Sequence, residues 1–150
     1  METFSSVAQN REELHLSVDV SQSEAPLFTW KGVGDLTFLR SLAKIREASK
    51  SWNSIEDAKT EIQNWSGNSS FELMLREVIG KATGEWELPF SEDELCHCRV
   101  VPTDIVNSAI IGGAHSTSKV SAQTNASTQC GTCRPDVEKI LNYRLKLPSA

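Results

Sequence analysis

The feature that most constrains this chain is the placement of its four cysteines. They form two close pairs, Cys96 with Cys98 and Cys130 with Cys133, and 31 residues separate the pairs. Two chelating pairs of thiolates are what a [2Fe-2S] cluster requires, with two ligands on each iron. Four cysteines also hold structural zinc, although zinc sites more often use pairs with two or more intervening residues. The spacing therefore favours [2Fe-2S] ligation, with zinc as the second interpretation and a disulfide or free-thiol arrangement as the third.

The start of the chain predicts a cytoplasmic protein. It reads Met-Glu-Thr-Phe and lacks the basic start and apolar run of a secretory signal. No apolar stretch is long enough to span a membrane, so we expect no membrane association. Disulfides are rare in a reducing compartment, and this favours metal or redox chemistry for the four cysteines.

Composition divides the chain into two modules, residues 1–90 and 91–150. All four tryptophans lie in the first module and all four cysteines in the second. The first module carries nine Lys/Arg and fourteen Asp/Glu, a net charge of −5, whereas the second carries six of each. Because neither module has an excess of basic residues, we expect no nucleic-acid binding.

The first module begins with two predicted strands. Apolar residues alternate with polar ones from Leu14 to Val20, which is the period of a half-buried strand. Residues 21–26 are turn-like, and residues 27–31 are predicted to form a second, antiparallel strand. Gly32-Val33-Gly34 then forms a tight turn that leads into a helix. The whole chain is predicted to be α+β, with a two-strand-plus-helices module first.

Three helices are predicted after these strands. Asp35 is suited to the N-cap of a helix that ends near Lys50. Its expected apolar face is formed by Leu36, Leu39, Leu42 and Ala43. Ser54 with Asp57, and Ser69 with Glu72, have the spacing of capping boxes, so helices are expected over about 55–64 and 70–82.

The second module is predicted to be all-helical. Thr103 is expected to cap a helix over 104–111, which Gly112-Gly113 ends. A short helical turn is expected over 116–122. Pro135 is suited to the first position of a last helix that reaches about residue 146. The apolar face of this last helix is expected to contain Val137, Ile140, Leu141 and Leu145.

The residues around the cysteines resemble a known family. The chain reads Cys-His-Cys-Arg-Val-Val-Pro-Thr-Asp-Ile from Cys96, and Thr-Gln-Cys-Gly-Thr-Cys-Arg-Pro around the second pair. Over residues 96–143 this resembles the [2Fe-2S] domain of bacterioferritin-associated ferredoxins (BFD), which is also the middle domain of NifU. The resemblance implies that Cys96, Cys98, Cys130 and Cys133 ligate one [2Fe-2S] cluster in a small helical fold.

Residues 1–90 carry a weaker resemblance. Leu-His-Leu-Ser-Val-Asp from Leu14, and Phe-Thr-Trp-Lys-Gly-Val-Gly from Phe28, look like the strand pair and glycine corner of NifU/IscU-type scaffold domains. That family carries three cysteines and this module carries none. Asp35 stands where one of them is expected. The resemblance therefore implies a degenerate scaffold-like module that has lost its cluster chemistry.

Few other residues have candidate roles. His97 is predicted to point away from the cluster, and His115 to lie in a surface loop. Arg99 and Arg134 flank the cysteine pairs. They either offset cluster charge, or bind a partner's carboxylate, or are simply exposed. The tryptophans are expected to pack in the core and its rim. No Ser/His/Asp or paired-carboxylate site can be argued, so no enzyme is expected.

Three functions follow from these observations. The first is one-electron transfer, or cluster or iron handling, through the cluster domain. Its expected partner is a redox protein, a ferritin-type protein or the iron–sulfur assembly machinery. The second is a NifU-related assembly accessory, and the third is a zinc-stapled interaction protein. The intact cysteine set favours the first.

Overall fold

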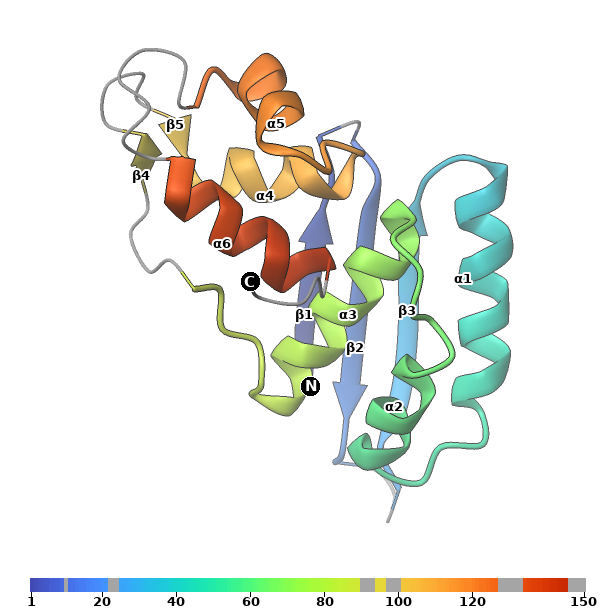
Figure 1. Cartoon of the computed structure of the whole chain (residues 1–150). Helices are drawn as coiled ribbons and strands as arrows, with labels where there is room; N and C mark the ends of the chain where they lie inside the picture. Colours follow the sequence, from blue (N-terminus) through green and yellow to red (C-terminus); the bar gives the residue numbers. More distant parts are fainter. Residues whose placement is uncertain (10, 22–24, 90–93, 97–100, 127–133, 146–150) are drawn as a thin grey trace. The chain divides into compact units, whose positions relative to one another are not determined.

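The computed structural model describes residues 1–9, 11–21, 25–89, 94–96, 101–126 and 134–145 (Figure 1). The chain divides into two compact units. Unit 1 comprises Met1–Val7 and Arg11–Trp86, and unit 2 comprises Ala8–Asn10 and Glu87–Ala150. The predicted α+β class is confirmed, because antiparallel strands come first and helices follow. No helix in the described ranges is long and apolar enough to cross a membrane.

Unit 1 contains a three-stranded antiparallel sheet in the order β1-β2-β3. Strand β2 (Glu13–Asp19) and strand β3 (Leu27–Val33) are the two predicted strands. Strand β1 (Glu2–Val7) was not predicted, so the count of two strands was wrong. Its sequence Glu-Thr-Phe-Ser-Ser-Val is mostly polar and has no alternation strong enough to reveal it. It forms because β2 offers it a full ladder, from Glu2 opposite Val18 to Val7 opposite Glu13.

The helices of unit 1 begin at the predicted caps. Helix α1 spans Leu36–Ser49, α2 spans Ile55–Ile62 and α3 spans Ser70–Thr83. The Asp35 carboxylate accepts the backbone N–H of Phe38 at 2.8 Å, and Ser69 Oγ accepts that of Glu72 at 3.3 Å. The carboxylate of Asp57 accepts the backbone N–H of Ser54 at 3.2 Å. Each bond satisfies a donor that a helix start leaves without an intrahelical partner.

The core of unit 1 lies between one face of the sheet and helices α1 and α3. Leu14, Leu16 and Trp30 contribute from the sheet, and each is at most 3% exposed. Helix α1 contributes Phe38, Leu42, Ile45 and Ser49. The predicted apolar face of α1 was therefore wrong apart from Leu42. Leu36 is 63% exposed, Leu39 is 45% exposed, and Ala43 is also exposed.

Phe38 selects the buried face of α1 through its contact with the glycine corner. A Cβ atom on Gly32 would lie 2.7 Å from Phe38 Cε1, and one on Gly34 would overlap the same ring. Phe38 also meets Phe71 of α3 edge-on, with ring centroids 5.1 Å apart. The glycines are thus required for close packing of an aromatic ring, and Gly32 belongs to β3 rather than to the predicted tight turn.

The described residues of unit 2 form three helices and one short strand pair. Strands β4 (Glu94–Cys96) and β5 (Val101–Pro102) are antiparallel, so the prediction of an all-helical module was wrong in this detail. Helices α4 (Thr103–Ile111), α5 (Thr117–Thr124) and α6 (Arg134–Leu145) confirm the predicted helices. Thr103 is the first residue of α4, and the N-cap position belongs to Pro102.

The three helices of unit 2 pack around a common apolar core. Val137, Ile140, Leu141 and Leu145 of α6 are all buried, which confirms the predicted face. After α4, Gly113 has a φ of +119° and the Ala114 N–H bonds to the Ala109 carbonyl at 3.0 Å. His115 was predicted to be a surface loop residue. It is half-buried, and its Nε2 lies 3.1 Å from the Ile110 carbonyl oxygen at the end of α4.

Asp35→Ala should destabilise unit 1 by about 1 kcal/mol, because the cap at the start of α1 is lost. Asp35→Asn should retain most of the stability, since its side chain can still accept a backbone N–H. Urea unfolding followed by tryptophan fluorescence reports unit 1 selectively, because all four tryptophans lie within it. Equal stability of the alanine variant and the parent protein would contradict the assignment of Asp35 as a stabilising cap.

Candidate metal centre

The four cysteines lie mostly beyond the described part of the chain. Cys96 is the last residue of β4, and only its backbone is described. Cys98, Cys130 and Cys133 lie outside the described residues, as do His97 and Arg99. The candidate site is therefore defined by the elements that hold the two cysteine segments at their ends.

In the sequence, the first cysteine pair falls at the end of β4 and before β5. Glu94 lies opposite Pro102, and Cys96 lies opposite Val101, with an irregular register between them. Thr103 follows at once as the first residue of α4. The Cys96–Cys98 segment thus belongs to a short connection whose two ends are fixed by β4 and β5. Such a connection suits a chelating pair, because both ends are held close together.

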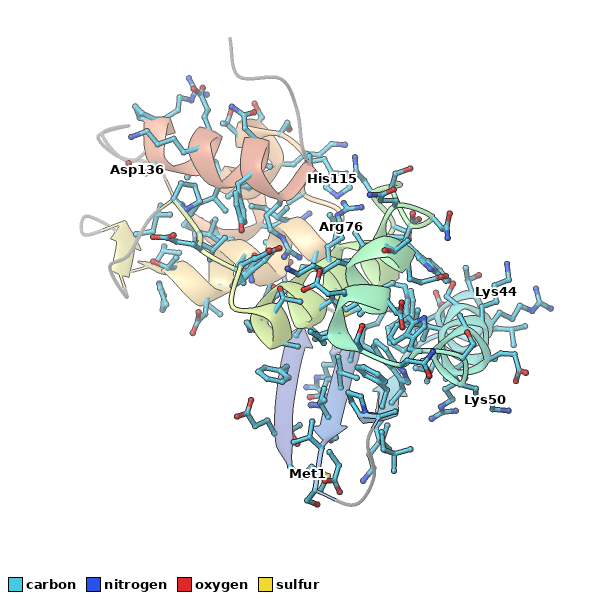
Figure 2. All side chains as sticks on the ribbon, turned by 90° about the horizontal axis from the view of Figure 1, so that it is seen from below. Met1, Lys44, Lys50, Arg76, His115 and Asp136 are labelled. Carbon is cyan, nitrogen blue, oxygen red and sulfur yellow. The ribbon has the colours of Figure 1, made fainter. Side chains whose placement is uncertain are left out.

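The second cysteine pair directly precedes α6. Arg134 is the first residue of α6 and is exposed. In Figures 1 and 2 the start of α6, where Asp136 is labelled, lies at the same end of unit 2 as β4 and β5. The described frame therefore brings the chain that leaves Cys133 to the end of the unit where Cys96 lies.

Two helices begin just after the two cysteine pairs. The first turn of a helix has free N–H groups and the positive end of the helix dipole. Helices α4 and α6 have 9 and 12 residues, long enough for a developed dipole. Pairs of thiolates carry negative charge, which helix starts of this kind stabilise. The donor set of four thiols and the two adjacent helix starts fit a thiolate-bound, anionic metal cluster.

A family comparison identifies the segment. Residues 95–143 match the family model described as BFD-like [2Fe-2S] binding domain. Over these residues the chain is similar to BFD-like [2Fe-2S] binding domains. The match covers about a third of the 150 residues and contains all four cysteines. No curated protein and no solved structure matched the chain.

The chain is therefore an iron–sulfur protein, and its cofactor is a [2Fe-2S] cluster. The resemblance drawn from the cysteine motifs is confirmed, with the matched segment starting one residue earlier than expected. Between its cysteine segments the BFD-like domain contains β5, α4 and α5, and α6 follows the second pair. These elements set the distance between the two ends of the site.

The structure also brings together polar residues that the sequence did not reveal. Ser5 Oγ lies 2.7 Å from His15 Nδ1, and His15 Nε2 lies 3.4 Å from a Glu13 carboxylate oxygen. These side chains lie on the face of the sheet opposite Leu14 and Leu16, because side chains alternate along β2. The sequence carried no signal for this group, because Ser5 lies opposite His15 only through the pairing of β1 with β2.

This group does not form a metal site. No cluster of three or more His, Cys, Asp or Glu side chains able to hold a metal occurs among the side chains that the structure describes. The 3.4 Å separation between His15 and Glu13 is long for a charge-assisted hydrogen bond. The group is thus a cross-strand polar contact of an exposed sheet face.

Protein purified without oxygen should be coloured and contain about two irons and two acid-labile sulfides per chain. The measurement is metal analysis with sulfide determination and an absorption spectrum. A colourless protein with a single stoichiometric zinc would contradict the cofactor assignment.

Removal of the cluster with a chelator should lower the helical circular dichroism of unit 2, because a unit of about 60 residues buries little core of its own.

Proposed function

We propose that this chain is a one-electron carrier that exchanges electrons with a protein partner in the cytoplasm. In this proposal Cys96, Cys98, Cys130 and Cys133 are the four cluster ligands. The cluster supplies one-electron redox chemistry when bound. The observation that carries the proposal is that every cysteine of the chain lies inside the BFD-like segment.

The surroundings of the ligand segments support an electron-transfer role. The described residues that flank the two cysteine segments belong to β4, β5 and α6, which are regular elements of one unit. The N–H groups at the starts of α4 and α6 stabilise negative charge, and this stabilisation contributes to the reduction potential. Arg134 adds a positive charge at the start of α6, where a partner's carboxylate can pair with it.

Unit 1 has a recognition role in this proposal rather than a chemical one. It has no cysteine, and the carboxylate of Asp35 is used to cap α1. This residue stands where the scaffold resemblance expects a thiolate ligand. Unit 1 therefore supplies no donor with which to assemble a cluster. In this proposal the BFD-like segment supplies the chemistry, and the chain acts as a carrier rather than as an enzyme.

Replacing any one of Cys96, Cys98, Cys130 or Cys133 with serine should lower cluster occupancy severely, because a hydroxyl is a poor ligand for iron in such clusters. His97→Ala is the matched control within the first pair and should retain full occupancy. Iron content per chain and the visible spectrum measure the outcome. Full occupancy in Cys98→Ser together with loss in His97→Ala would show that the histidine is the ligand instead.

Electron transfer and cluster handling can be separated in one experiment. The reduced protein is mixed with an oxidised ferredoxin and, separately, with a cluster-free ferredoxin. A carrier should reduce the first within seconds, and it should keep its iron and sulfide in the second mixture over hours. Transfer of iron and sulfide to the cluster-free acceptor, with no electron exchange in the first mixture, would contradict the proposal and favour the assembly role.

A further inference from the structure

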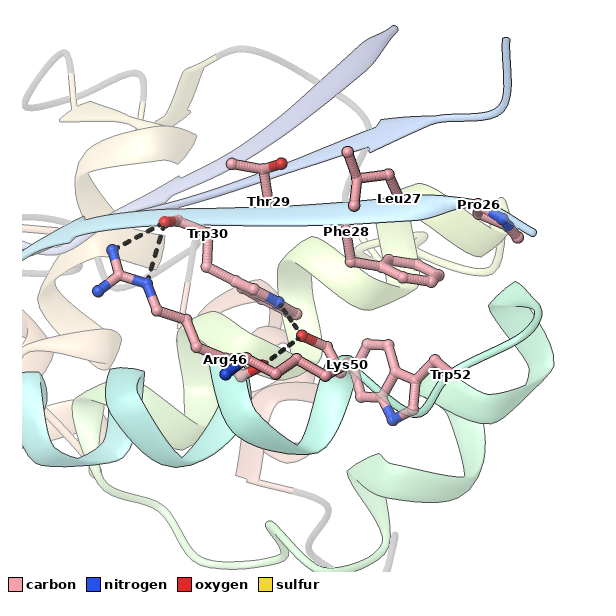
Figure 3. A pocket seen from close by; sticks show the side chains of 9 residues that line it. Pro26, Leu27, Phe28, Thr29, Trp30, Arg46, Lys50 and Trp52 are labelled. Carbon is pink, nitrogen blue, oxygen red and sulfur yellow. Dashed lines mark hydrogen bonds between the residues drawn. The ribbon is translucent and has the colours of Figure 1, made fainter. Parts of the chain in front are cut away.

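Unit 1 has a groove between the outer edge of its sheet and helix α1. It has a volume of about 310 Å³. The strand β3 side is formed by Pro26, Phe28 and Trp30, and the α1 side by Arg46 and Lys50, with Trp52 at one end. Figure 3 shows that α1 runs alongside β3, with the rings of Phe28 and Trp30 between them.

The outer edge of β3 has backbone groups available for pairing. Strand β3 is last in the sheet order, so one side of it has no neighbouring strand among the described residues. The Trp30 carbonyl accepts hydrogen bonds from Arg46 Nη2 at 2.9 Å and Nε at 3.3 Å, so it points to this outer side. Backbone groups alternate along a strand, and Phe28 therefore directs both its N–H and its C=O to the same side. Neither Phe28 group has a partner among the described residues outside the sheet ladder.

The aromatic wall of the groove is held in place before any ligand binds. The Phe28 and Trp52 rings meet edge-on with centroids 5.0 Å apart, and Trp30 meets Trp52 at 6.1 Å. The Trp30 indole N–H donates to Ser49 Oγ at 3.0 Å, and Ser49 donates to the Arg46 carbonyl at 3.0 Å. A wall that is already ordered reduces the entropic cost of binding.

The groove is basic although unit 1 as a whole is acidic. Five of the nine Lys/Arg in residues 1–90 fall within residues 31–50, against two carboxylates. Of these two, Asp35 caps α1, and Glu47 forms an exposed ion pair with Lys50 at 2.8 Å, so the region keeps a net charge of +3. Arg46 and Lys50 are one helical turn apart on the groove side of α1, and the Lys50 side chain is 72% exposed. The charge around the groove is therefore complementary to an acidic ligand.

We propose that this groove binds an extended acidic segment of a partner protein, which adds to the outer edge of β3 as a fourth strand. Side chains on one face of a strand recur every 6.6–6.8 Å or so. Residues four apart on a helix are about 6 Å apart along its axis. Two carboxylates on one face of the added strand can thus meet Arg46 and Lys50 together. An apolar side chain next to them on the same face lies against Phe28 and Trp52.

Pairing with a second copy of this chain is disfavoured by the same charges. Two β3 edges brought together would place Lys31, Arg46 and Lys50 of both copies near one another, and like charges in close proximity are repulsive. Nucleic acid is a poorer match, since residues 1–90 have a net charge of −5 and the β3 edge offers backbone pairing that only a polypeptide uses. The inference concerns unit 1 alone and does not depend on the role of the cluster.

The test uses the full chain and a fluorescein-labelled peptide of sequence Thr-Glu-Thr-Glu-Thr-Val-Thr-Val, followed by fluorescence anisotropy. The peptide places two glutamates and two valines on one face of a strand. It should bind, and raising the salt concentration should weaken its binding. The same peptide with lysine in place of glutamate should not bind. Absence of binding by the acidic peptide, or equal binding by the lysine peptide, would overturn the proposal.

Two matched pairs of variants locate the binding site. Lys50→Glu should weaken peptide binding by about tenfold or more. Lys44→Glu changes the net charge equally and should have a much smaller effect, because Lys44 projects from another side of α1 (Figure 2). Phe28→Ala and Phe28→Pro both remove the ring, but only proline removes the outward N–H, so the proline variant should bind about fivefold more weakly.

For each pair of variants, one outcome would show that the peptide does not bind in the groove as proposed. Equal losses in Lys44→Glu and Lys50→Glu would show that the peptide responds only to overall charge. Equal affinity of the two Phe28 variants would show that no strand is added at this edge. Competition by a single-stranded oligonucleotide as effective as the unlabelled peptide would assign the surface to polyanions in general. Tryptophan-monitored urea unfolding confirms that every variant compared is folded.

Discussion

The metal centre requires both cysteine pairs at the same end of unit 2, although 31 residues separate them in the sequence. Cys96 ends β4, Arg134 follows Cys133, and the intervening residues include two helices that must turn the chain back. Gly112 and Gly113 end α4 at its C-terminus, and Asn125 ends α5 with a φ of +68°. Buried residues of α6 then fix the third helix of the same core, so that its first turn starts at the end where β4 lies. A cluster can bind only when all four thiolates are close together, so cluster binding is coupled to the folding of unit 2. The geometry of the loops matters only if the helices bring them together.

How much of this was predictable differs between the two units. Local signals were reliable: caps at Asp35, Ser54 and Ser69, the glycine stop after α4 and the buried stripe of α6 were all evident in the sequence, because each depends on neighbouring residues only. The cluster site was predictable as a set of residues, since the cysteine spacing and the surrounding motifs are themselves local. Strand β1 was not, because a polar strand is stabilised by the partner with which it pairs and not by its own pattern.

Helix α1 shows why a periodic pattern does not identify the buried face by itself. Leu36, Leu39 and Ala43 form one apolar stripe, and Phe38, Leu42 and Ile45 form another. Both have helical spacing, and the predicted face consisted of the first stripe together with Leu42. The structure buries the second, because the Phe38 ring fits over Gly32 and Gly34, where any side chain would collide with it. The decisive contact joins two elements, so it was beyond any argument from one helix. The glycine corner did carry the signal, but it was interpreted as a turn.

The exposed edge of β3 raises a general difficulty for open sheets, because unpaired backbone groups invite association with any strand. Arg46 reduces the number of unpaired backbone groups by donating hydrogen bonds to the Trp30 carbonyl. The positive charges of Lys31 and Lys50 disfavour pairing with a second copy. Such protection is selective and not complete. A strand that carries carboxylates would meet attraction where a strand of this chain meets repulsion. The outward Phe28 backbone groups, which have no partner among the described residues outside the sheet ladder, lie beside an ordered aromatic wall. The charges that protect the edge from self-association are therefore the charges that would define its partner. Edge protection and partner choice follow from a single arrangement of residues in unit 1.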